Sequence, residues 1–226
     1  LLHFAFGLMQ KGLFIHKECI SLVSLKKEES NMAEITAALV KELRDITGAG
    51  MMACKKALTA TDGDMDKAVD YLREQGLAGA EKKAGRIAAE GVSFTKLSAD
   101  GKSGVVVEVN AETDFVAKNE KFRNFVDEVA AQALTSNAKD IESFLAEKWA
   151  LDPSKTVSEQ LSTTISVIGE NMNIRRFEKL EEQNGLVQDY VHSGGRIGVL
   201  LQVKSSVVND AIKEMAKNVA MQIAAL

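Results

Sequence analysis

Apolar residues recur at helical spacing in the first third of the chain, between residues 33 and 76. Thr36 is placed to cap a first helix. Three apolar positions would form one face of that helix: Leu39, Leu43 and Ile46. The sequence TGAG at residues 47–50 would end it, and a second helix would follow. A third helix is expected from about Asp64 to Gln75, with Gly76 ending it. The pattern predicts a three-helix unit.

From Val92 the hydrophobic period shortens from that of a helix to that of a strand. GVSFTKL and VVVEVN read as a β-hairpin, and NEKFRNFVDEVAAQAL follows as an amphipathic helix. After the only proline, in LDPSK, Thr156 and Glu159 have capping-box spacing at the start of a helix that Gly169 would end. NMNIRRFEKL and RIGVLLQVK are expected strands, and residues 208–226 a last helix. The predicted fold class is α+β.

The second half of the chain repeats the first. The strand GVVVEV at residues 104–109 aligns with GVLLQV at residues 198–203, which lie 94 positions later. In the following helices Phe122 aligns with Ile212, at an offset of 90. The first copy therefore holds four extra residues between strand and helix, and they fall in the region of TDFV.

Two interpretations of Phe115 follow. It stands seven residues before Phe122, so a continuous helix would bury both side chains on one face. The repeat favours the other interpretation, because the second copy makes the same strand and helix without the four residues. Asp114 and Phe115 would then form an exposed tip on a loop, where binding residues concentrate.

Met51 and Met52 pose a similar question on the second expected helix. Adjacent residues on a helix diverge by about 100°. We therefore expect at most one of the two side chains to enter a small core, and the other to be available to a partner.

The charge balance argues against direct binding to nucleic acid. The 226 residues include 28 Lys and Arg against 32 Asp and Glu, a net charge of -4, with a pI near 5.6. The two cysteines and three histidines have no metal-ligand spacing. No apolar run approaches the roughly 20 residues that span a bilayer. We expect a cytoplasmic protein without a cofactor, a metal or a membrane partner.

Two sequences resemble nucleotide-binding motifs but lack the required context. GAGMMA from Gly48 follows a helical stripe, whereas the dinucleotide fingerprint follows a strand. DGKSG lacks the first glycine of a P-loop and precedes a strand. No catalytic constellation or convergent polar pocket is evident, so we do not expect an enzyme.

Residues 1–31 lack an initiator Met and fit neither a secretory signal nor a transit peptide. The KKEESN before Met32 can be encoded by a purine tract like a bacterial ribosome-binding site. We expect an untranslated leader read in frame, with the natural start at Met32. The alternative is a genuine extension.

Several separate segments closely resemble the translation elongation factor Ts family, in order from Ala33 to Leu226: AEITAALVKELRDITGAGMMACKKAL, ETDFVAKN, IGENMNIRRF and HSGGRIGVL. One departure is Asn119, where many members carry Asp. The resemblance implies a ubiquitin-associated-like helical domain at residues 32–80. Two α+β core subdomains would follow at residues 81–150 and 151–226.

The family's function implies that this chain is a guanine-nucleotide exchange factor for elongation factor Tu. On this resemblance a helical corner would dock on the GTPase domain of the partner, through Arg44, Met51, Met52 and Lys55. Asp114 and Phe115 match an intruding pair that disturbs the Mg²⁺ and phosphate site, with Thr113 and Val116 supporting it. His192 matches a contact in the second subdomain, and Ile168 a packing position beneath it.

The chain stops on MQIAAL without a helix-stop signal, whereas family members typically continue. We therefore expect a truncated product whose second subdomain lacks a strand or two. An alternative function stays open at this point. The chain would be a binding module or adaptor with a ubiquitin-associated-like head and no exchange activity.

Overall fold

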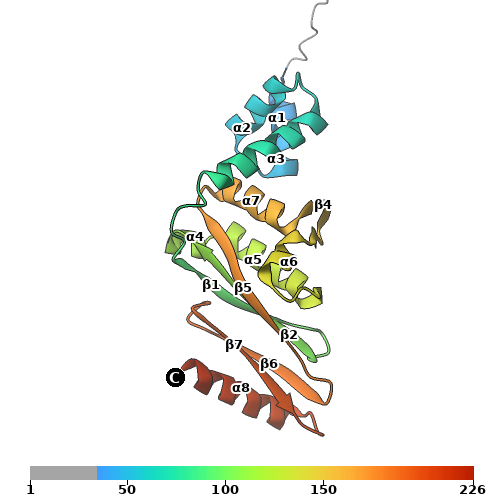
Figure 1. Cartoon of the computed structure of the whole chain (residues 1–226), viewed down its shortest axis with the longest axis vertical. Helices are drawn as coiled ribbons and strands as arrows, with labels where there is room; N and C mark the ends of the chain where they lie inside the picture. The colour runs from blue at the N-terminus through green and yellow to red at the C-terminus, as the bar shows by residue number, and fades with distance from the viewer. Residues whose placement is uncertain (1–34) are drawn as a thin grey trace, which may run out of the picture. The chain divides into compact units, whose positions relative to one another are not determined.

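Three helices open the computed structural model, which describes residues 35–226 (Figure 1). Helix α1 (Ala37–Thr47) begins after Thr36, whose side chain accepts a hydrogen bond from the Leu39 N–H, and it ends at Gly48 with φ 66°. Helix α2 spans Met51–Ala60. The predicted cap and helix break are confirmed, whereas the leader or extension expected at residues 1–31 lies outside the described residues.

The head formed by α1, α2 and α3 has a small core of its own. Leu43, Cys54 and Leu58 are fully buried in it. Leu39 packs against this core, but Ile46 is 63% exposed, so the predicted apolar stripe is wrong at its last position. Residues from the earlier turns of α1 and from the other two helices fill this small core, and the last turn of α1 extends beyond it.

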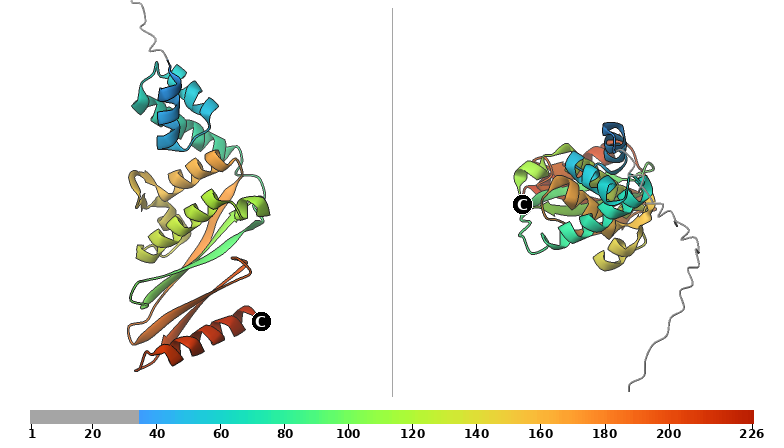
Figure 2. Two further views of the ribbon diagram at one scale, coloured as in Figure 1. Left: turned by 180° about the vertical axis from the view of Figure 1, so that it is seen from behind. Right: turned by 90° about the horizontal axis from the view of Figure 1, so that it is seen from above.

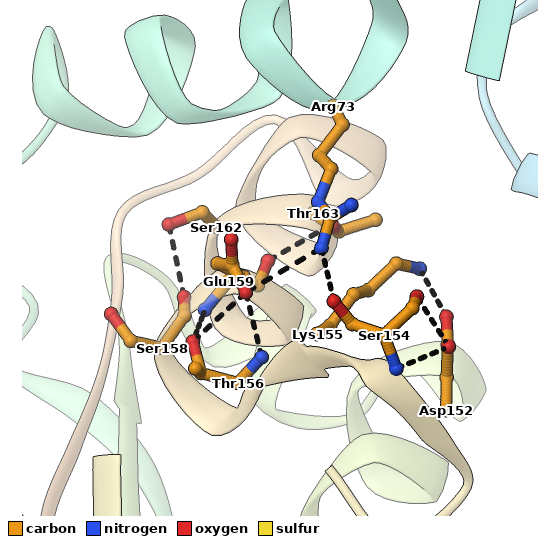
Figure 3. A network of polar contacts seen from close by, with 9 residues as sticks. All are labelled: Arg73, Asp152, Ser154, Lys155, Thr156, Ser158, Glu159, Ser162 and Thr163. Atoms are coloured by element: carbon orange, nitrogen blue, oxygen red, sulfur yellow. Dashed lines mark hydrogen bonds and ion pairs between the residues drawn. The ribbon is translucent and has the colours of Figure 1, made fainter. Parts of the chain in front are cut away.

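Helix α3 (Met65–Glu81) runs through Gly76, so the predicted helix end at this residue is wrong. Gly76 is buried where α3 meets helix α7 (Val157–Ile168), and a Cβ there would lie 3.8 Å from the Ser166 Cβ. The two helices are therefore close enough here for a Cβ to be in ordinary van der Waals contact. Arg73 of α3 reaches the same region and donates to the Ser154 carbonyl near Glu159, as Figure 3 shows.

The predicted capping box at the start of α7 is confirmed. The Glu159 carboxylate accepts from the Thr156 N–H at 2.7 Å, and the Thr156 hydroxyl accepts from the Glu159 N–H at 3.2 Å. Helix α7 ends at Gly169 with φ 94°, as the sequence indicated.

A three-stranded antiparallel sheet in the order β1-β2-β5 carries the main core. Its strands are β1 (Glu90–Leu97), β2 (Ser103–Ala111) and β5 (Met172–Glu181). On one face lie α4 (Asp114–Ala117), α5 (Glu120–Thr135), α6 (Ile141–Ala146) and α7. Val105, Val107 and Val109 alternate along β2 and pack against this helical layer. A short hairpin of β3 (Lys148–Trp149) and β4 (Asp152–Thr156) contains the proline.

A second hairpin, β6 (Gly185–His192) and β7 (Ile197–Lys204), lies against the other face of this sheet and carries α8 (Asp210–Ala224) on its outer side (Figure 2). Strand β6 was not among the strands predicted from the sequence. Strand β5, in the range expected for the second subdomain, pairs with β2, so the first sheet extends across the proposed boundary at residues 150 and 151. The α+β class is confirmed.

The hairpins β1–β2 and β6–β7 contact each other reciprocally. The Ser93 N–H donates to the Gly195 carbonyl at 2.6 Å, and the Val187 N–H donates to the Gly101 carbonyl at 2.8 Å. Each pair becomes the other when residues 94 positions apart are exchanged. The contact between β1–β2 and β6–β7 is therefore a local pseudo-two-fold interface.

Equivalent glycines bring the hairpins close together at this interface. A Cβ on Gly104 would lie 2.8 Å from Val187 Cγ1 and 3.2 Å from Leu200 Cδ2. A Cβ on Gly198 would lie 3.1 Å from Ser93 Cβ and from Val106 Cγ2. A side chain on either strand would crowd the facing sheet, and more severely at Gly104 than at Gly198.

Candidate functional site

The residues of α4, Asp114–Ala117, form a tip between β2 and α5, here called the α4 tip. The Thr113 hydroxyl accepts the Val116 N–H at 3.3 Å, which starts the helix. Val116 packs against the main core and Ala117 is buried, whereas Phe115 is 81% exposed. The structure thus places Phe115 on the surface, as the repeat indicated, and not in the core beside Phe122.

A carboxylate from a different turn holds the start of the α4 tip. Glu170 accepts the Thr113 N–H at 3.0 Å and the Thr113 hydroxyl at 2.7 Å. In return the Glu112 carboxylate accepts the Asn171 N–H. Ile168, partly buried against the main core, ends α7 two residues before Glu170. The exposed Phe115 ring therefore stands on a base that is held by hydrogen bonds between residues 112–113 and residues 170–171.

Asp114 gives the tip a charged edge beside the aromatic ring. Its carboxylate lies 2.6 Å from the Lys118 Nζ one helical turn later. That hydrogen bond is the main reason why the pKa of Asp114 lies below its ordinary value. The carboxylate is therefore ionised at neutral pH.

His192 lies on the exposed end of β6, at the start of a turn formed by residues 192–196, here called the His192 turn. Its Nδ1 is 3.0 Å from the Tyr190 hydroxyl, so the imidazole has a fixed neighbour on one side. Ser193, Gly194 and Gly195 all have positive φ, of 49°, 67° and 105°. This left-handed backbone makes the turn tight.

Arg123 on α5 joins the α4 tip to the His192 turn. Its Nε donates to the Ala117 carbonyl at 2.8 Å, and its Nη2 donates to the Gly194 carbonyl at 2.7 Å. The structure thus brings together two predicted site elements that stand far apart in the sequence. Neither Arg123 nor Glu170 was expected to support the site, because each makes a hydrogen bond to a segment far away in the sequence.

The helical corner of the head forms a second exposed surface, built on a separate core. Met51 is 59% exposed and Met52 is 77% exposed, and Arg44 and Lys55 are exposed as well. Neither methionine enters the core, because α2 buries Cys54, Ala57 and Leu58 instead. Ile46, at the end of α1, is exposed as well and lines a cleft on the side of the head that faces β4 and α7.

A cleft of about 500 Å³ lies between the head and the segments β4 and α7. Three of its charged side chains, Arg73, Asp152 and Lys155, pair with neighbours. Lys155 lies 3.1 Å from Asp152, and Arg73 lies 3.6 Å from Glu159 (Figure 3). Within residues 35–226 no group of three or more potential metal ligands occurs, and no helix is long and apolar enough to cross a membrane.

Comparison with known proteins places this geometry in context. The family model described as Elongation factor TS matches residues 112–226. The curated elongation factor Ts proteins of Clostridium novyi (strain NT), Clostridium perfringens (strain SM101 / Type A) and Clostridium kluyveri (strain NBRC 12016) are each 56% identical over 191 residues. Each alignment covers 84% of this chain and 62% of the relative, so the chain spans less than two thirds of their length.

Proposed function

The chain belongs to the elongation factor Ts family, and on that premise we propose that it acts in translation elongation as a guanine-nucleotide exchange factor for elongation factor Tu. The observation that carries the proposal is Phe115, a large aromatic ring that is 81% exposed on a rigidly held tip. Its own fold leaves this ring in water, so burial against a partner would supply hydrophobic free energy that folding does not. In this proposal it enters elongation factor Tu near the bound Mg²⁺ and phosphates.

A small displacement in the partner suffices for exchange. Mg²⁺ requires near-octahedral coordination, so moving a neighbouring element weakens its hold and that of the phosphates. Linkage then requires that the factor bind the GDP-free partner more tightly by the same free energy. GTP replaces GDP by mass action, and this chain needs no covalent chemistry.

Burial of one Phe supplies about 1.5–3 kcal/mol, on the order of a tenfold to hundredfold change in an equilibrium. The remaining free energy must come from further contacts. We assign these to His192 and to the helical corner of Arg44, Met51, Met52 and Lys55, whose exposed methionines can adapt to a partner surface.

The test is the release of fluorescent GDP from purified elongation factor Tu in excess GTP. The full chain should accelerate release, and Phe115→Ala should reduce the acceleration by about tenfold to a hundredfold without changing the unfolding temperature. Leu151→Ala is the matched control, because it removes another exposed apolar side chain in the β3–β4 hairpin. Unchanged acceleration with Phe115→Ala would contradict the proposal.

Binding without exchange is the second candidate function. It is favoured by the head, whose exposed helical corner stands on a core independent of the α4 tip. Saturable binding to elongation factor Tu without faster GDP release would support this function. Loss of that binding in Met52→Ala but not in Phe115→Ala would assign it to the head.

A further inference from the structure

Arg123 is the side chain through which the α4 tip and the His192 turn are joined. It lies near the start of α5, directly after the fully buried Phe122. The rest of α5 packs on the main core. The Arg123 backbone is therefore fixed by the core. From this base the guanidinium reaches the Ala117 carbonyl on one side and the Gly194 carbonyl on the other.

The chemistry of arginine suits this bridge. The planar guanidinium holds its N–H groups in a rigid fork, so two acceptors bound to it have a defined separation. The two distances, 2.8 Å and 2.7 Å, are those of charge-assisted hydrogen bonds. One acceptor ends the helix that carries Phe115, and the other lies two residues after His192.

We propose that Arg123 is a positioning residue that sets the spacing between Phe115 and His192, so that both meet the partner in one rigid arrangement. This inference rests on the proposed exchange function. Fixing two contact elements before binding reduces the entropy lost when the complex forms. Arg123 itself need not touch the partner.

Loss of the bridge should loosen the two elements without unfolding them, because each keeps another anchor. Glu170 still holds Thr113 at the start of the α4 tip. The Ser93 N–H still donates to the Gly195 carbonyl in the turn. A change at Arg123 can therefore be separated from general loss of structure.

Hydrogen–deuterium exchange tests the bridge directly. In Arg123→Gln, amides of residues 117–119 and 195–196 should exchange about threefold to tenfold faster, while the rest of α5 stays protected. Arg175→Gln is the control, since it removes the same charge from an exposed ion pair with Glu108. Unchanged exchange in both segments of Arg123→Gln would overturn the proposal.

GDP release from elongation factor Tu tests the consequence for exchange. Arg123→Gln should lower the acceleration by about threefold to tenfold in the parent chain. It should add nothing in the Phe115→Ala/His192→Ala background, where no contact remains to be positioned. An equal loss in both backgrounds would indicate a general structural effect and overturn the proposal. A parent chain that does not accelerate release would refute the exchange function alone, because hydrogen exchange tests the bridge separately.

Discussion

Replacement of Gly104 by alanine tests whether the close approach of the two hairpins limits the stability of the molecule. The new Cβ would lie 2.8 Å from Val187 Cγ1 and from Leu97 Cδ2, closer than carbon atoms pack. Leu97 is half-buried and can turn away, but Val187 is buried and its β-branched side chain is stiff. Relief therefore requires the sheets to separate or a buried side chain to leave its preferred rotamer.

The expected cost of this overpacking is about 1–3 kcal/mol. The loss of glycine's freedom in the unfolded chain offsets about 0.4–1 kcal/mol of it. The net destabilisation should be on the order of 1–2 kcal/mol, which lowers the unfolding temperature by about 2–8 °C in a protein of this size.

Thermal unfolding followed by circular dichroism measures this effect, with Gly79→Ala as the matched control. Gly79 lies inside α3, and a Cβ there would meet no atom within 4 Å. That variant should gain about 0.5–1 kcal/mol, because alanine is a better helix former. Both variants change the unfolded chain alike, so their difference reports on packing. A Gly104→Ala protein as stable as Gly79→Ala would refute the reasoning.

Three further predictions concern the helix contacts and the base of the tip. Glu170→Gln puts an NH2 donor in place of one of the two oxygens that accept from Thr113, so it should cost about 1–2 kcal/mol by urea unfolding and slow GDP release; full activity would contradict the role of this carboxylate. Hydrogen bonding from the Thr156 N–H lowers the pKa of Glu159 below its ordinary 4.5. The ionised carboxylate therefore stabilises the fold above pH 4.5, and this contribution is lost as the pH falls through the folded pKa. Glu159→Gln should therefore show a flatter decline of unfolding free energy below pH 4.5, and a curve parallel to that of the parent would exclude this contribution. Gly76→Val should lower the unfolding temperature through about 1–3 kcal/mol of overpacking against α7, whereas Gly76→Ala, at an ordinary contact distance, should not.

Local signals predicted the local structure well. The Thr36 cap, the capping box of Thr156 and Glu159, and the helix end at Gly169 depend on residues within one turn, so the sequence alone contains them. The predicted helix end at Gly76 was wrong because a glycine that ends a helix and one inside a helix that packs on another element look the same in sequence. Only the position of α7 distinguishes them.

Strand β6 could have been found from the repeat. Residues 90–97 form β1, and the offset of 94 leads to residues 184–191, which nearly coincide with β6. The apolar residues of its sequence, GLVQDYVH, come in adjacent pairs and do not alternate with polar ones, so the strand does not stand out by periodicity. The same repeat did indicate the exposure of Phe115, because it compares two copies of one architecture. The bridge through Arg123 had no such signal, since one of its acceptors is a backbone carbonyl 71 positions away.

The pseudo-two-fold contact between the hairpins has the form of a homodimer interface made within one chain. In a symmetric homodimer, a feature added to one subunit appears in both. Here the two copies have separate sequences, so the extra residues and the α4 tip occur only between β2 and α5, while residues 205–209 connect β7 to α8 without a helix. The tip that carries Phe115 therefore breaks the symmetry of the fold. Within residues 35–226 the duplicated core therefore carries this aromatic tip in one of its two copies and not in the other.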